Sequence, residues 1–105
     1  MSRLIALIFA ISNGGVVYTK RFYSAIVNTG ASVDHDSVIG DYAHVAPGAR
    51  LGGHVRVGEG ALLGVGSAFL PGVSVGAWAT VGVGAAVVGD VPEGVIARGV
   101  PARWR

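Results

Sequence analysis

The chain contains no cysteine, and charged residues make up only 13% of its 105 residues. The missing cysteine excludes disulfide bridges, thiolate metal sites and a cysteine nucleophile. The low charge is atypical of disordered tails, coiled coils and charge-rich helical bundles. Eight Lys and Arg against six Asp and Glu give a net charge of +2, and scattered basic residues argue against a nucleic-acid surface. A chain of this length folds into one small domain at most.

Glycine and apolar residues are abundant instead, and they follow a six-residue period. Every sixth residue from Val27 is a branched aliphatic residue or Phe. These anchors are Val27, Val33, Ile39, Val45, Leu51, Val57, Leu63, Phe69, Val75, Val81 and Val87. The residue two positions before each anchor is always Ala, Ser or Val, from Ala25 to Ala85. Glycine follows the anchor at Gly40, Gly52, Gly58, Gly64, Gly76 and Gly82.

A period of six fits neither an amphipathic helix nor a simply alternating strand. It fits one short strand followed by a tight turn, with the anchor filling the interior and the small residue packing where two walls converge. Three such units make a triangular coil of 18 residues, and coils stack through parallel ladders about 4.8 Å apart. We therefore predict an all-β parallel β-helix, a triangular prism, over residues 25–90, and expect the glycines after the anchors to take turn conformations with positive φ. A glycine-rich β-sandwich is the alternative.

The repeat resembles the left-handed β-helix of hexapeptide acyltransferases. The segment VNTGASVDHDSVIGDYAHVAPGA, from Val27 to Ala49, is similar to the NeuD/PglD type of sugar O- and N-acetyltransferase. The tail GVPAR, from Gly99 to Arg103, resembles the end of the coenzyme-binding domain in this superfamily. The resemblance implies a left-handed coil, a homotrimer with sites between subunits, acetyl-CoA as co-substrate and a small-molecule sugar or nucleotide-sugar acceptor. It also makes residues 91–105 a coenzyme-binding tail.

Residues 1–24 do not continue the repeat, because the in-register positions are Gly15 and Arg21. Members of the resembled family carry an N-terminal nucleotide-sugar-binding domain, which this sequence is expected to lack. We interpret the segment as a truncated start or a cap on the prism. The apolar run from Leu4 to Ile11 leaves a signal peptide as an alternative, but eight residues are too few to span a membrane. The missing cysteine and the supply of coenzyme favour the cytoplasm.

His35 is the candidate catalytic residue. It stands between Asp34 and Asp36, two residues after an anchor, which places it at a corner of the coil with its ring outside the core. One coil further on is Gly53, so no side chain stacks over the imidazole. A neighbouring carboxylate orients a histidine base and stabilises its charged form. The resemblance implies that His35 deprotonates the acceptor and that Asp36 is its acidic partner, although the family often has Glu there.

His44 lies nine residues after His35, half a coil away. Within one chain the two histidines should therefore occupy different sides of the triangle, roughly 15 Å apart. If both serve one site, they come from different subunits. The resemblance implies that His44 contacts acetyl-CoA, that the Gly53 N–H faces the thioester oxygen, and that the Val65 and Val83 backbones contact the coenzyme.

Two arginines of the tail complete the implied binding residues. By the same resemblance, Arg103, together with Arg98, meets the adenine and phosphate end of the coenzyme. We assign no metal ligands. The function predicted is acetyl transfer by direct attack of the acceptor on the thioester, since an acetyl-cysteine intermediate is impossible. The alternatives are a β-helix carbonic-anhydrase-type metalloenzyme using three histidines, a non-catalytic structural β-helix, and an inactive remnant that still binds coenzyme.

Overall fold

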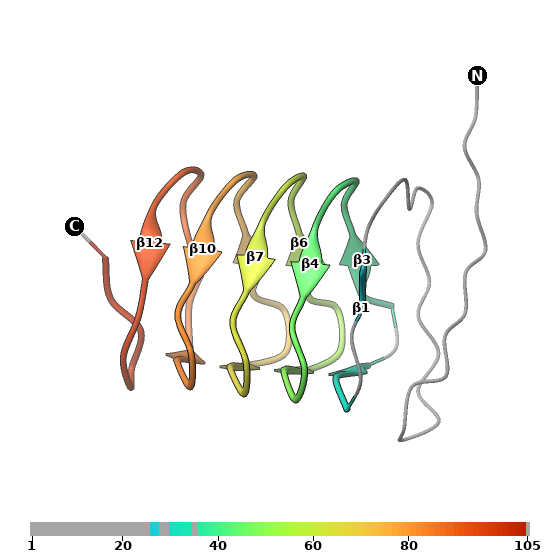
Figure 1. The fold of residues 1–105 in the computed structure, drawn as a ribbon, viewed down its shortest axis with the longest axis horizontal. Helices are drawn as coiled ribbons and strands as arrows, with labels where there is room; N and C mark the ends of the chain where they lie inside the picture. The colour runs from blue at the N-terminus through green and yellow to red at the C-terminus, as the bar shows by residue number, and fades with distance from the viewer. Residues whose placement is uncertain (1–25, 28–29, 35, 105) are drawn as a thin grey trace.

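The computed structural model describes residues 26–27, 30–34 and 36–104, and these wind into a stack of triangular coils (Figure 1). Each six-residue unit contributes one two-residue strand, because a tight turn follows each anchor. Within the described residues the strands are β1 (Ile26–Val27), β2 (Ser32–Val33), β3 (Val38–Ile39), β4 (His44–Val45), β5 (Arg50–Leu51), β6 (Arg56–Val57), β7 (Leu62–Leu63), β8 (Ala68–Phe69), β9 (Ser74–Val75), β10 (Thr80–Val81), β11 (Ala86–Val87) and β12 (Ile96–Ala97).

The strands form three parallel sheets, one on each side of the prism. Face A has the order β1-β4-β7-β10-β12, face B the order β11-β8-β5-β2, and face C the order β3-β6-β9. Partners along most of the stack lie 18 residues apart, as in the pairing of Ile26 with His44 and of His44 with Leu62. The predicted architecture is confirmed: the fold is an all-β, left-handed parallel β-helix with an 18-residue coil.

The core consists of the two columns that the repeat defines. Anchors such as Ile39 and Leu63 are fully buried, and Phe69 at 4% exposure is nearly so. The small residues two positions earlier are buried as well, among them Ala43 and Ala61 at 0%. From Ser32 on, the residue immediately before each anchor points outward, because side chains alternate along a strand. That outward column supplies the surface of each face.

The glycines that follow the anchors do not take positive φ, so that part of the prediction is wrong. Positive φ falls two positions later, at the third residue after the anchor. Gly66 and Gly84 fill this position with φ of 69° and 71°. A glycine directly after the anchor is needed for close approach instead: a Cβ on Gly64 would lie 2.6 Å from the Val81 carbonyl oxygen of the next coil. The two glycine columns therefore have different physical causes.

Parallel pairing continues past residue 90, where the six-residue repeat ends. The last coil is two residues shorter than the others. Val91 bridges to Val75 and Ile96 pairs with Thr80, so the partners are 16 rather than 18 residues apart. The carboxylate of Asp90 accepts a hydrogen bond from the Ser74 N–H at 2.9 Å and closes the shortened corner.

The tail then folds back over the end of the stack. Arg98 and Arg103 exchange backbone hydrogen bonds of 3.1 and 2.9 Å, and the Ala102 N–H donates to the Ala86 carbonyl at 2.8 Å. Trp104 packs against the buried core from the end of the prism. The interpretations of residues 1–24, as a truncated start, a cap or a signal peptide, lie outside the described residues. No helix that could cross a membrane occurs in the part of the chain that the structure describes.

Candidate active site

The candidate site is built on the corner between faces B and C, here called corner II. Its described residues are 34, 36–37, 52–55 and 70–73 in successive coils. The third residue after the anchor turns the chain at each level, with φ of 59° at Asp36, 61° at His54 and 82° at Gly72. Because the coil repeats every 18 residues, Asp36 and His54 occupy the same position of the corner, one coil apart. His35 lies outside the described residues, whereas its neighbours Asp34 and Asp36 are both exposed.

Asp36 and His54 are in contact. The His54 Nε2 lies 3.4 Å from the Asp36 Oδ2, and the two side chains are 64% and 54% exposed, respectively. The contact is an ion pair whenever the imidazole is protonated. The predicted acidic partner of His35 therefore contacts a second histidine from the next coil. Sequence reasoning gave His54 no part in the acetyltransferase site.

A buried hydroxyl joins the same two levels of corner II. The Ser37 Oγ donates to the Gly52 carbonyl at 3.1 Å and accepts from the Val55 N–H at 3.2 Å. In turns at other corners, the two equivalent backbone groups bond to each other directly. In the turn between faces C and A, for example, the Ala61 N–H donates to the Gly58 carbonyl at 3.2 Å. Ser37 thus stands inside the turn that carries Gly53 and His54. The sequence showed a serine in the column of small residues, but it did not show this bridge.

Gly53, the predicted oxyanion donor, is buried in this turn. Its carbonyl accepts a hydrogen bond from the Gly72 N–H at 2.9 Å, which fixes the plane of the peptide that follows it. No acceptor for the Gly53 N–H occurs among the residues that the structure describes. A backbone N–H of this kind is the group that stabilises a developing oxyanion.

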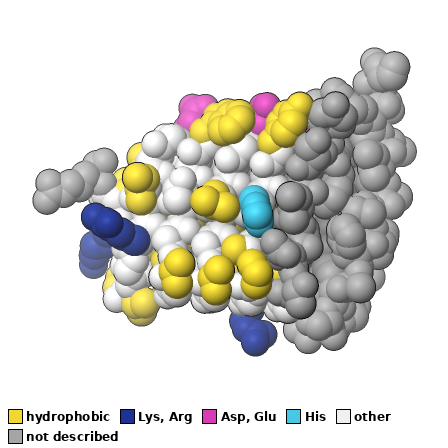
Figure 2. Space-filling model, viewed as in Figure 1, with side chains coloured by type: hydrophobic (Ala, Val, Ile, Leu, Met, Phe, Trp, Pro, Cys, Tyr) yellow, Lys and Arg dark blue, Asp and Glu magenta, His cyan; other side chains and the backbone are white. Residues whose placement is uncertain are grey.

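His44 lies on a different side of the prism. It belongs to β4 on face A, pairs with Ile26 and Leu62, and is half-buried. Face A is the side opposite corner II in the triangular cross-section. Figure 2 views this face and shows one histidine beside apolar side chains. The apolar residues on it include Leu62 at 41% exposure and Ile96 at 63%.

The other predicted coenzyme contacts also lie away from corner II. Val65 and Val83 occupy the corner between faces A and B, here called corner I, and both are exposed. Arg98 continues this edge in the last coil, because its Cβ lies next to Gly82. In one chain the described site residues thus lie apart, with Asp36 and Gly53 at corner II, His44 on face A, Val65 and Val83 at corner I, and Arg103 in the tail that folds over the end of the stack.

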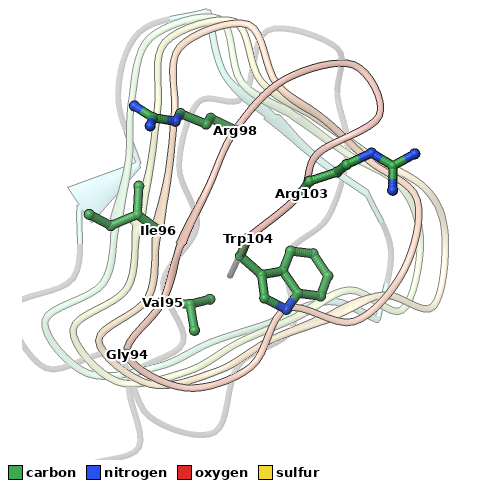
Figure 3. Close-up of a pocket in the computed structure, with 6 residues that line it drawn as sticks. All are labelled: Gly94, Val95, Ile96, Arg98, Arg103 and Trp104. Carbon is green, nitrogen blue, oxygen red and sulfur yellow. The ribbon is translucent and has the colours of Figure 1, made fainter.

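The C-terminal end of the prism is hollowed (Figure 3). A cavity of about 700 Å³ is lined by Gly94, Val95, Ile96, Arg98, Arg103 and Trp104. Figure 3 shows the Trp104 indole lying over the interior, with Arg98 and Arg103 pointing to opposite sides of the chain. This cavity belongs to the last coil, so it is separate from the contact between Asp36 and His54. Sequence reasoning missed Trp104, whose position directly after the tail motif was the available signal.

Among the described residues, no group of three or more His, Asp or Glu side chains is arranged to hold a metal ion. The arrangement instead offers a carboxylate, an imidazole and a backbone N–H at one corner. Such groups can orient a base and stabilise an oxyanion.

Comparisons with known proteins show that the chain is similar to acetyltransferases. No protein-family model matches the chain. The chloroplastic serine acetyltransferase 1 of Arabidopsis thaliana is 45% identical over 83 residues, which cover 71% of this chain and 26% of that protein. The acetyltransferase domain of PglB from Neisseria gonorrhoeae FA1090, solved in complex with acetyl coenzyme A, has a TM-score of 0.76 at 41% identity, covering 77% of this chain and 40% of that one.

PerB from Caulobacter crescentus, solved in complex with CoA and GDP-perosamine, has the same TM-score at 52% identity, covering 77% of this chain and 39% of that one. This chain therefore spans well under half the length of each of these proteins. The structural neighbours are hexapeptide-repeat acetyltransferases. They support the NeuD/PglD resemblance only as far as the broader group of hexapeptide-repeat acetyltransferases, because serine acetyltransferases match the chain as well.

Proposed function

We propose that this chain is an acetyl-CoA-dependent acetyltransferase whose acceptor is an amino or hydroxyl group of a sugar or nucleotide sugar. The observation that carries the proposal is the 52% identity to PerB, which was solved with both CoA and a nucleotide sugar. The corner with Asp36 and the buried Gly53 supplies groups suited to this chemistry. The chemistry also requires no cysteine, which the chain lacks.

In the proposed reaction His35 removes the proton from the acceptor, and Asp36 orients and stabilises the imidazole. The acceptor nitrogen or oxygen then adds to the acetyl carbonyl. The Gly53 N–H donates to the oxyanion of the tetrahedral intermediate, which collapses and expels the CoA thiolate. His44, Val65 and Val83 bind the coenzyme along its length, and Arg103 meets the adenine and phosphate end.

A homotrimer reconciles these roles with the fold. Corner II and face A lie on opposite sides of one prism, so one site needs Asp36 and Gly53 from one protomer and His44 from its neighbour. The apolar surface of face A, with Leu62 and Ile96 exposed, suits burial against another protomer. We therefore place the proposed site in the cleft between subunits.

Serine is a second candidate acceptor, favoured by the 45% identity to the Arabidopsis serine acetyltransferase. The two candidates share the coenzyme, the base and the oxyanion donor, so they differ only in the acceptor. An assay that follows release of the CoA thiol distinguishes them, with GDP-perosamine and L-serine as alternative acceptors.

The first test is calorimetric titration of the purified chain with acetyl-CoA, with the subunit mass measured in the same sample. We expect saturable binding of one coenzyme per chain in a trimer. His35→Ala should then abolish thiol release and leave coenzyme binding nearly unchanged. A well-folded trimer that binds no acetyl-CoA would overturn the proposal in favour of a structural β-helix, and binding without transfer would favour an inactive remnant.

A further inference from the structure

The contact between Asp36 and His54 is fixed by the backbones of both partners rather than by chance proximity of two surface side chains. Each residue takes the positive φ that turns the chain at corner II, 59° at Asp36 and 61° at His54. Both Cβ atoms therefore leave the corner in the same direction, separated by one step of the stack of about 4.8 Å. At that separation an imidazole from one level reaches a carboxylate from the next, as the 3.4 Å distance shows.

The residues directly after Asp36 and His54 join the two neighbouring coils through hydrogen bonds. Ser37, directly after Asp36, bridges the Gly52 carbonyl and the Val55 N–H through its buried hydroxyl. The Val38 N–H donates to the Val55 carbonyl at 2.8 Å. Val55 directly follows His54, so both partners are anchored within one residue of the contact.

The turn itself does not require a histidine at position 54. Glycine fills the same position one coil further on, at Gly72, and meets the backbone demand without the steric cost that an L-residue meets at positive φ. The imidazole also adds little to stability, because contacts between exposed charged groups are weak. What the side chain does supply is a ring nitrogen, Nε2, that lies 3.4 Å from Oδ2 of Asp36.

We propose that His54 is a positioning residue for acetyl transfer, acting through Asp36. This inference rests on the proposed function, in which Asp36 orients the base. The carboxylate of an aspartate can rotate, and contact with His54 at Oδ2 restricts that rotation. A carboxylate has two oxygens and about four acceptor sites, so this contact is compatible with a second hydrogen bond to the neighbouring base. His54 thus holds the short Asp36 side chain in the orientation that the base requires.

The test is a double-mutant cycle with His54→Gly and Asp36→Asn, measured by release of the CoA thiol with the acceptor that the wild-type chain uses. Glycine removes the imidazole and suits the positive φ. We expect His54→Gly to lower kcat about tenfold and to leave KM for acetyl-CoA and the melting temperature nearly unchanged. In the Asp36→Asn background the same change should have no further effect, because the group through which His54 acts is then altered.

His54→Gln is the matched conservative variant. Its Nε2 stands the same number of bonds from Cα as the imidazole Nε2, so it keeps a donor within reach of Asp36. We expect it to retain most of the wild-type kcat. His54→Ala replaces the glycine variant in the cycle if the glycine variant does not fold.

The outcomes separate the two proposals. A wild-type chain that transfers acetyl to none of the acceptors removes the proposed function, and the role of His54 with it. An active wild-type chain whose kcat is unaffected by His54→Gly overturns the role of His54 alone. An equal loss of kcat in the wild-type and Asp36→Asn backgrounds also overturns it, because His54 would then act independently of Asp36.

Discussion

The indole of Trp78 lies over Gly60, one coil away in the corner between faces C and A. A Cβ built on Gly60 would fall among the atoms of the six-membered ring of the indole. Gly60 also takes a φ of 68°, and the Trp78 N–H donates to the neighbouring Glu59 carbonyl at 2.7 Å. The backbone of the corner is therefore hydrogen-bonded while the 59% exposed Trp78 covers it.

Gly60→Ala should destabilise the fold by about 1 kcal/mol more than Gly84→Ala, because only the first substitution displaces a ring. Gly84 has a similar φ of 71° and no atom within 4 Å of its added Cβ, so Gly84→Ala carries the conformational cost alone. Urea denaturation followed by circular dichroism, at one protein concentration, measures the difference. In a Trp78→Ala background, Gly60→Ala and Gly84→Ala should lower the free energy of unfolding by the same amount. If the two substitutions already have equal effects in the wild-type background, the ring has no such role.

Gly64→Ala should be more harmful than Gly66→Ala, although the two glycines share one turn. The added Cβ at Gly64 meets backbone atoms of the next coil, 2.6 Å from the Val81 oxygen, and backbone cannot swing aside. We expect a loss of about 3 kcal/mol or failure to fold. The Cβ added by Gly66→Ala points into open space at a φ of 69°. This substitution should lower the free energy of unfolding by about 1 to 2 kcal/mol, because an L-residue is strained at that φ. Thermal melts of the two variants test the order, and the reverse order would contradict the assignment of the two glycine columns.

Ser37→Ala should lower the acetyl-transfer activity while changing the free energy of unfolding only slightly. Without the hydroxyl, the Val55 N–H and the Gly52 carbonyl can form the direct bond that closes other corners, so we expect a loss of at most about 1 kcal/mol. That rearrangement moves the turn carrying Gly53 and His54, and acetyl transfer should therefore fall.

Urea denaturation and the thiol-release assay measure the two effects of Ser37→Ala. Ser67→Ala is the control for stability, because Ser67 is a buried serine in the same column whose hydroxyl donates to the Gly64 carbonyl at 2.7 Å. Unchanged transfer by Ser37→Ala would show that the hydroxyl does not set the geometry of the turn.

Leu62→Glu should dissociate the proposed trimer and leave the coil folded. Leu62 points outward from β7 at the centre of face A, so a carboxylate there would be buried against a neighbouring protomer without a partner. Light scattering should give the mass of a trimer for the wild-type chain and of a monomer for the variant, with similar circular dichroism. Ala68→Glu, at the outward position of β8 on face B, should remain trimeric. The opposite result would move the subunit contact to face B.

The period of six predicted the coil, the buried anchors and the column of small residues, because stacking parallel coils imposes the same constraint on every turn. The 18-residue spacing also placed Gly53 below the His35 position, and the same arithmetic would have placed His54 below Asp36. The site residues drawn from resemblance, such as His44 and Arg103, stay predictions, and His35 lies outside the described residues.

Sequence periodicity alone determined the stacked parallel coil, since the period records which backbone position each residue occupies, whereas the left-handedness was implied only by the family resemblance. Only the tertiary structure decided the atomic contacts between coils. It placed His54 Nε2 against Asp36 Oδ2, and it inserted the Ser37 hydroxyl into a turn that other coils close directly. It also brought Val91 to the anchor position two residues early. These features depend on side-chain direction and on hydrogen bonds between residues about 18 apart, which a repeat of backbone positions does not encode.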